Sequence, residues 1–99
     1  MHDTAENERI KLNAETAKAN WSELERHYAR GVMIKVARDL DLVEVATAMA
    51  RDDKDAFTRW MNAGHVARPS DADALSWHEH NATLWAVVVA PWVLVQEVS

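Results

Sequence analysis

The hydrophobic pattern of this chain is dominated by one stretch, Leu84–Val95 (LWAVVVAPWVLV), in which every position is apolar. A run without a polar face cannot form a one-sided surface strand, because half of its side chains would then contact water. We therefore expect it to be covered on both faces, as a central strand or at a subunit contact. Pro91 has no N–H to donate to a ladder, so it divides the run into two segments, Leu84–Val89 and Trp92–Gln96.

Two shorter segments also have β-type patterns. Val32–Val36 (VMIKV) is β-branched and alternating, with Val32, Ile34 and Val36 on one face, which is typical of a half-buried strand. Residues 65–67 (HVA) form a very short candidate strand. The pattern predicts a small sheet of about three strands, in which the C-terminal strand is the most buried.

The first third of the chain has helical periodicity. Apolar positions at Ile10, Ala14 and Ala17 predict a helix to about Lys18, and the same spacing continues to Tyr28. Residues 8–30 therefore form either one long helix or two. A capping box, Ser22 with Glu25, favours two helices with a bend near Trp21.

Three more helices are predicted downstream by their capping residues. They begin after Asp41, Asp53 and Ser70, and end near Asp52, Gly64 and His80. Gly31 and Asn81 are natural left-handed stops. The polar residues 1–7 are expected to be disordered. The sequence therefore predicts a single α+β domain over residues 8–97, with four or five helices packed on the sheet.

Composition narrows the class of protein. Ninety-nine residues suit one domain, and only two Gly and two Pro argue against an all-β fold. The absence of Cys excludes disulfides and thiolate chemistry, and the net charge of −5 argues against nucleic-acid binding. The N-terminus has no signal-peptide pattern, and the apolar run is shorter than the ~18–20 residues of a membrane span. We expect a cytoplasmic protein without a membrane partner.

No catalytic or metal-binding motif emerges from the pattern. His78 and His80 lie two positions apart, which on a helix separates them by about 200° and prevents them from sharing a metal ion. They would share a face only if residues 77–81 were extended. His27, one turn after Glu23, and His78 are the candidates for an enzyme, but no spacing supplies catalytic geometry. We assign no catalytic residue, metal or cofactor, and an enzyme is the least favoured function.

The five tryptophans, at positions 21, 60, 77, 85 and 92, are the compositional anomaly. Each indole N–H needs a partner, so Trp favours boundaries and interfaces. The favoured function is therefore a non-enzymatic protein-interaction module that forms a homodimer. Its interface would use Trp85, Val87, Val89, Trp92 and Leu94. The alternative is a sensor of a small anion, with a pocket lined by Arg30, Arg38, Trp60, Arg68 and Trp77.

Five pieces of the sequence resemble a known family. They are KLNAETAK, WSELERHYARG, DLDLVEVATAMARDD, WMNAG and LWAVVVAPWVLVQE. Together they resemble the bacterial family known as domain of unknown function 2288, over residues from about Lys11 to Glu97. The resemblance implies a small stand-alone bacterial protein. It implies no activity and supplies no catalytic residue.

Overall fold

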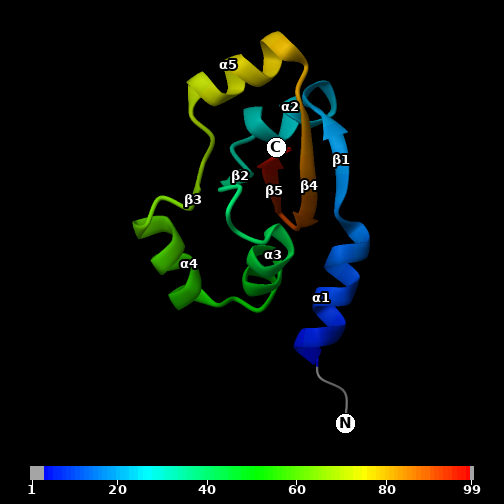
Figure 1. Cartoon of the computed structure of the whole chain (residues 1–99), viewed down its shortest axis with the longest axis vertical. Helices are drawn as coiled ribbons and strands as arrows, with labels where there is room; N and C mark the ends of the chain where they lie inside the picture. The colour runs from blue at the N-terminus through cyan, green and yellow to red at the C-terminus, as the bar shows by residue number, and fades with distance from the viewer. Residues whose placement is uncertain (1–3, 99) are drawn as a thin grey trace.

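A five-stranded sheet forms the centre of the computed structural model, which describes residues 4–98 (Figure 1). Its strands are β1 (Ala17–Asn20), β2 (Met33–Val36), β3 (Val66–Ala67), β4 (Thr83–Val89) and β5 (Trp92–Glu97). The helices are α1 (Thr4–Glu15), α2 (Trp21–Ala29), α3 (Leu42–Ala50), α4 (Lys54–Asn62) and α5 (Asp71–His80). The α+β class and the five helices are confirmed, whereas the prediction of about three strands is wrong.

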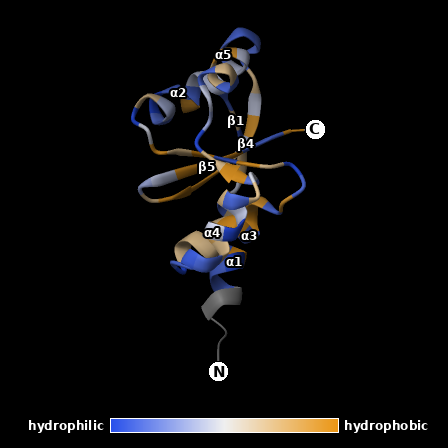
Figure 2. Cartoon of the chain, turned by 90° about the vertical axis from the view of Figure 1, so that its left-hand side faces the viewer, coloured by the Kyte–Doolittle hydropathy of each residue, from blue (hydrophilic) through white to orange (hydrophobic). Residues whose placement is uncertain are grey.

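Helices cover both faces of this sheet. Helices α1, α3 and α4 lie on one side, and α2 and α5 lie on the other (Figure 2). The strand order is β1-β4-β5-β2-β3, in which β5 runs parallel to β2 and the other neighbours are antiparallel. Val93, Leu94 and Val95 of β5 are all buried. Since successive residues of a strand point to opposite faces, this burial confirms that the C-terminal strand is covered on both faces.

The apolar run reverses its direction at Ala90 and Pro91, so that β4 and β5 form an antiparallel hairpin. The Ala90–Pro91 peptide bond is cis. The expectation that the whole apolar run is covered on both faces is wrong for β4, where Val88 is 55% exposed and Trp85 is 36% exposed. Because β1 pairs only with residues 83–86 of β4, no strand of the described residues 4–98 lies on that side of the β4 end that contains Val88.

Strand β1 is the element that the sequence pattern misses. Its residues, AKAN, were expected to be helical or to form a bend, because Ala and Lys favour helices. Pairing with β4, from Ala17 opposite Ala86 to Asn20 opposite Thr83, overrides this local preference. The strand separates α1 from α2, so the two-helix alternative for residues 8–30 is correct.

The caps of the later helices follow the sequence prediction. Asp41 accepts hydrogen bonds from the backbone N–H groups of Val43 and Glu44, and Ser70 accepts one from that of Asp73. The left-handed residues that end the helices include Gly31, Gly64 and Asn81. The predicted box of Ser22 and Glu25 is wrong: the Asn20 N–H donates to the Glu23 carboxylate instead, and α2 begins at Trp21.

Two apolar clusters fill the space between the sheet and its two helical layers. On the α1 and α3 side, Leu94 packs with residues that include Leu12, Val45 and Ala46. On the other side, α2 and α5 contribute Trp21 and Trp77, whose ring centroids lie 5.5 Å apart. These clusters hold the sheet rigidly between the two helical layers.

Helix α1 differs from its prediction in two respects. It begins at Thr4, inside the segment 1–7 that was expected to be disordered, and residues 1–3 lie outside the described part of the chain. The prediction that Ile10 and Ala14 lie on the buried face of this helix is also wrong. Ile10 is 62% exposed and Ala14 is exposed, whereas Leu12 is buried. The helix packs mainly on α3, which covers only a narrow face of it.

Within residues 4–98, none of the helices is long and apolar enough to cross a membrane.

Candidate functional site

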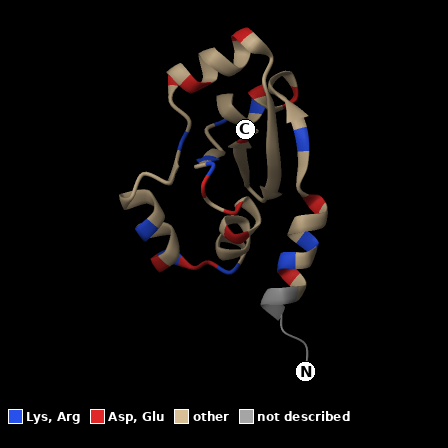
Figure 3. Ribbon diagram, viewed as in Figure 1, with Lys and Arg blue, Asp and Glu red and all other residues tan. Residues whose placement is uncertain are grey.

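A groove of about 450 Å³ lies between β2, β3 and the start of α5, and we call it the charged groove. Its lining residues are Lys35, Val36, Ala37, Arg38, Gly64, His65, Ala67, Arg68, Ser70, Asp73 and Glu97. The groove is at the carboxyl ends of the parallel strands β2 and β5, which is where open α/β sheets bind their ligands. Basic positions mark the chain near the ends of β2 and β3 (Figure 3).

The acidic residues of the charged groove are engaged by neighbouring side chains. Lys35 Nζ lies 2.9 Å from Asp73 Oδ1 and 3.8 Å from Glu97 Oε1. The indole Nε1–H of Trp77 donates to the other oxygen of Glu97, at 3.2 Å. Asp73 also accepts a hydrogen bond from the Ser70 N–H, as part of the cap of α5. Through these contacts the carboxylates of Asp73 and Glu97 already have partners within the chain.

The environment of Asp73 lowers the pKa of its carboxyl group. Burial alone would raise this pKa, but hydrogen bonds from the Lys35 ammonium and from Ser70 outweigh burial and hold it below its ordinary value of 3.8. The carboxylate is therefore charged at neutral pH, and it is matched by Lys35.

A pH dependence of stability follows from Asp73. Because its pKa is lower in the folded chain, its contribution is complete above about pH 3.8 and is lost as the pH falls through the folded pKa. We expect the Asp73→Asn variant to be less stable than the wild type at pH 7 and to lose less stability on acidification. Urea denaturation between pH 2.5 and 7 measures both effects. Equal acid sensitivity in the two proteins would contradict this account of the pair.

The basic side chains at the rim have weaker partners. The guanidinium of Arg38 lies 3.8 Å from Glu97 Oε1, and this side chain is 61% exposed. Arg68 makes no ion pair or side-chain hydrogen bond with any residue of the described chain. His65 Nε2 lies 4.0 Å from Asp39 Oδ2, which is the limit of an ion-pair contact. The rim therefore presents donors that remain available to a ligand.

The structure brings together two of the five residues predicted for an anion pocket. Arg38 and Arg68 both line the charged groove, whereas Arg30 and Trp60 do not. Trp60 lies on α4, where its ring meets that of Phe57 at 5.7 Å. Trp77 is buried and does not line the groove, but it contacts two lining residues: it donates a hydrogen bond to Glu97, and Lys35 Nζ lies 5.7 Å from its ring centroid.

Sequence reasoning missed the remaining polar residues of the groove with ionisable side chains, which are Lys35, His65, Asp73 and Glu97. These residues lie up to 62 positions from one another in the printed sequence, and no fixed spacing connects them. The one local signal is that charged residues gather where β2, β3 and β5 end. That signal requires the strand order, which the sequence pattern does not provide.

The five residues predicted for a dimer interface separate into two groups. Val87 and Leu94 are buried in the core between the sheet and α3, so they cannot contact a partner. Val89 and Trp92 are half-buried, and Trp85 is partly exposed under the Lys18 ammonium, which lies 5.0 Å from the ring centroid. All five residues lie on the same face of the β4–β5 hairpin, because they alternate with residues of the other face. The separation therefore reflects how far the helices cover that face: the cluster with α1 and α3 buries Val87 and Leu94 and covers the other three less completely.

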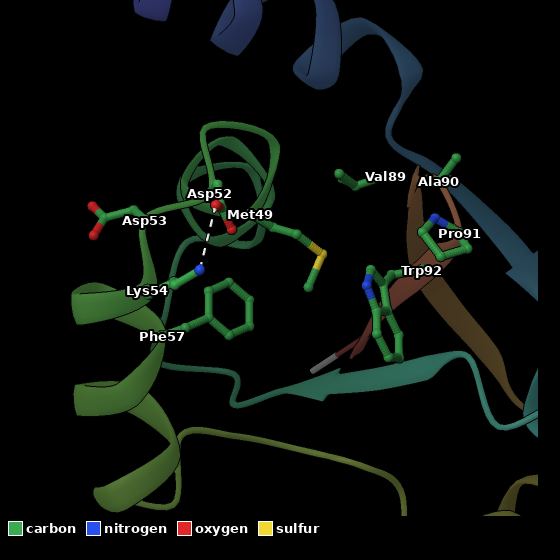
Figure 4. Close-up of a pocket in the computed structure, with 9 residues that line it drawn as sticks. All are labelled: Met49, Asp52, Asp53, Lys54, Phe57, Val89, Ala90, Pro91 and Trp92. Carbon is green, nitrogen blue, oxygen red and sulfur yellow. Dashed lines mark ion pairs between the residues drawn. The ribbon is translucent and has the colours of Figure 1, made fainter.

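A second groove, of about 260 Å³, lies between the hairpin turn and the α3–α4 connection, and we call it the apolar groove (Figure 4). The side chains of Met49, Phe57 and Trp92 border a common space in this view. The remaining lining residues are Asp52, Asp53, Lys54, Val89, Ala90 and Pro91. This surface includes Val89 and Trp92, the two half-buried members of the predicted interface.

The histidines that sequence analysis considered for an enzyme lie apart from both grooves. His27 is on α2, where burial and the charges of Arg26 and Arg30 lower its pKa below 6.5, so it is neutral at pH 7. His78 is in the last turn of α5, which is helical over Asp71–His80. Among the side chains of residues 7–98, no group of three or more His, Asp or Glu is arranged to hold a metal ion.

The fold and the groove define a small α+β protein with a polar groove at the carboxyl ends of a parallel strand pair. The chain belongs to the family described as "Protein of unknown function (DUF2288)", whose match covers residues 7–97. This match confirms the resemblance found in the sequence. A similar solved structure is the NMR solution structure of PA1075 from Pseudomonas aeruginosa. It is 41% identical, has a TM-score of 0.82, and is matched over 100% of this chain and 92% of that chain. A comparison with the curated proteins finds no match.

Proposed function

We propose that this protein binds a small anionic ligand in the charged groove. The observation that carries the proposal is the unequal pairing of its charges. The acids Asp73 and Glu97 are engaged by Lys35 and Trp77, while Arg38 has only a distant partner and Arg68 has none in the described chain. Two guanidinium groups are thus left to pair with a negative charge from outside the protein.

The chemistry of the rim favours a carboxylate or a phosphate group. A guanidinium presents a planar fork of N–H donors that matches two oxygens of such a group, and this geometry makes the hydrogen bonds strong and directional. Lys35 is already paired with Asp73, so the two arginines are the groups that would bind the anion.

The size of the charged groove favours an anionic group with an organic body. Its volume of about 450 Å³ falls within the range of small-molecule sites. Its lining includes the small residues Ala37, Gly64 and Ala67, which leave room for the body of a ligand. The proposal therefore concerns a small carboxylate or phosphate ester, and it assigns no catalytic step.

Calorimetric titration with inorganic phosphate, succinate and citrate tests the proposal. We expect at least one of these probes to bind the wild type, with an affinity that falls as NaCl is raised. Each charge-assisted hydrogen bond contributes about 1.5–3 kcal/mol, so Arg38→Ala and Arg68→Ala are each expected to weaken binding about tenfold or more.

Arg30→Ala is the matched control for these variants. Arg30 is exposed and lies outside the charged groove, so its removal changes the net charge equally without touching the site. Equal weakening by all three substitutions would show a general charge effect and contradict the proposal. Failure of the wild type to bind any of the three probes at millimolar concentration would also contradict it.

A further inference from the structure

The apolar groove leaves a set of large side chains partly exposed at the surface. Met49 from α3, Phe57 from α4 and Trp92 from β5 meet there, beside Pro91 of the hairpin turn (Figure 4). Aromatic rings and methionine at one site are typical of surfaces that accept an apolar side chain from a partner. The groove of about 260 Å³ has room for a single protruding side chain.

Acidic side chains stand at the rim of the apolar groove. Asp52 and Asp53 line it on the α3–α4 connection, and both are exposed. Lys54 is their basic neighbour, and its Nζ lies 3.9 Å from Asp52 Oδ2. With two aspartates and one lysine, this rim has a net negative charge. A partner that carries a basic residue next to its apolar side chain therefore complements it.

Helix α1 carries a segment with this composition. Ile10 is 62% exposed, and it is flanked by Arg9 and Lys11. Arg9 bonds Asp41 within the same chain, at 2.6 Å, whereas Lys11 has no ion pair with any residue that the structure describes. An exposed isoleucine beside an unpaired lysine on a helix matches an apolar groove with an acidic rim.

The position of α1 makes this segment accessible to another molecule. The helix projects at one end of a chain that is 48 Å long and 28 Å by 26 Å in cross-section (Figure 1). It lies on the same side of the sheet as α3 and α4, which border the apolar groove (Figure 2). One two-fold axis can therefore pair the helix of each copy with the groove of the other, so that a single contact occurs twice.

We propose that the protein self-associates as a two-fold dimer, in which Ile10 of each copy enters the apolar groove of the other. Lys11 then lies near Asp52 and Asp53 of the facing copy. This contact uses Val89 and Trp92 of the predicted interface, whereas Val87 and Leu94 are buried and take no part in it. It shares no residue with the charged groove, so ligand binding and self-association are separate properties.

Sedimentation velocity of the full chain, from about 5 to 500 μM, tests this proposal. We expect the wild type to form a dimer in this range, and Ile10→Asp to raise the dimer dissociation constant at least tenfold. Asp52→Asn is expected to weaken the dimer more modestly and to reduce its sensitivity to NaCl. Asn is the replacement of choice there, because Asp52 has a positive φ of 57°, which Asn tolerates.

Leu75→Asp is the control for introducing a charge at an exposed apolar position. Leu75 is 59% exposed, close to the value for Ile10, and it lies on α5, on the other side of the sheet. Circular dichroism confirms that each variant is folded before its association is measured. A wild type that is monomeric at 500 μM, or a dimer that is weakened equally by Leu75→Asp and Ile10→Asp, would overturn the proposal.

Discussion

Replacing Trp77 by alanine is expected to lower the free energy of unfolding by about 3–5 kcal/mol, as for other buried aromatic residues. Trp77 is only 3% exposed, and its ring packs against Trp21 between α5, α2 and the sheet. Truncation leaves a cavity at the point where α5 meets the core. It also removes the indole N–H that donates a hydrogen bond to Glu97 in the charged groove. Urea denaturation followed by far-ultraviolet circular dichroism measures the loss.

Trp77→Phe separates packing from hydrogen bonding in this prediction. Phenylalanine keeps an aromatic ring against Trp21 but cannot donate to Glu97, so a smaller loss of stability is expected. Because Glu97 then lacks one partner, its carboxylate is also expected to compete more strongly for Arg38 and to weaken anion binding. A loss below about 1 kcal/mol for Trp77→Ala would show that α5 does not depend on this side chain.

The parts of the fold that depend on local sequence are the parts that could be predicted. Ser70 and Asp41 cap helices because a hydroxyl or carboxylate oxygen reaches the backbone N–H groups that follow it, and no distant residue is needed. Asn81 ends α5 because its side chain tolerates the left-handed conformation. The burial of Val93, Leu94 and Val95 at the centre of β5 is likewise predictable from the apolar composition of that segment.

Elements that depend on pairing with distant residues could not be predicted in this way. The residues of β1, AKAN, favour a helix when taken alone, and only the open edge of β4 makes them a strand. Ile10 fits the spacing of a buried helical stripe, yet it is exposed because α3 contacts the face around Leu12 instead. In both cases the outcome is decided by a partner more than 20 positions away.

The candidate site shows the same division between local and distant information. Arg38 and Arg68 were singled out by their charge, and the pairing of β2 with β3 brings them to one groove. Trp60 and Trp77 were predicted to line the same pocket, but Trp60 packs against Phe57 on α4 and Trp77 is buried in the core. Residue type therefore identified the chemistry, while strand order determined which residues share the site.

Leu94→Ala is the second substitution with a large expected effect, a loss of about 2–5 kcal/mol in the free energy of unfolding. Leu94 is fully buried at the centre of β5, opposite Val87 of β4 and Ile34 of β2. Its side chain fills the space between the sheet and the helices α1 and α3. A central strand cannot move to close the cavity, because it is hydrogen-bonded on both sides, so the upper part of this range is expected.

Val88→Thr is the control for Leu94→Ala. Val88 belongs to the neighbouring strand of the same hairpin, but it is 55% exposed, and threonine keeps its β-branched shape. Surface substitutions of this kind change stability by about 0.5 kcal/mol or less. If Leu94→Ala were tolerated as well as Val88→Thr, β5 could not be the rigid centre of the sheet. The charged groove would then lack the fixed strand end that carries Glu97 to Lys35 and Arg38.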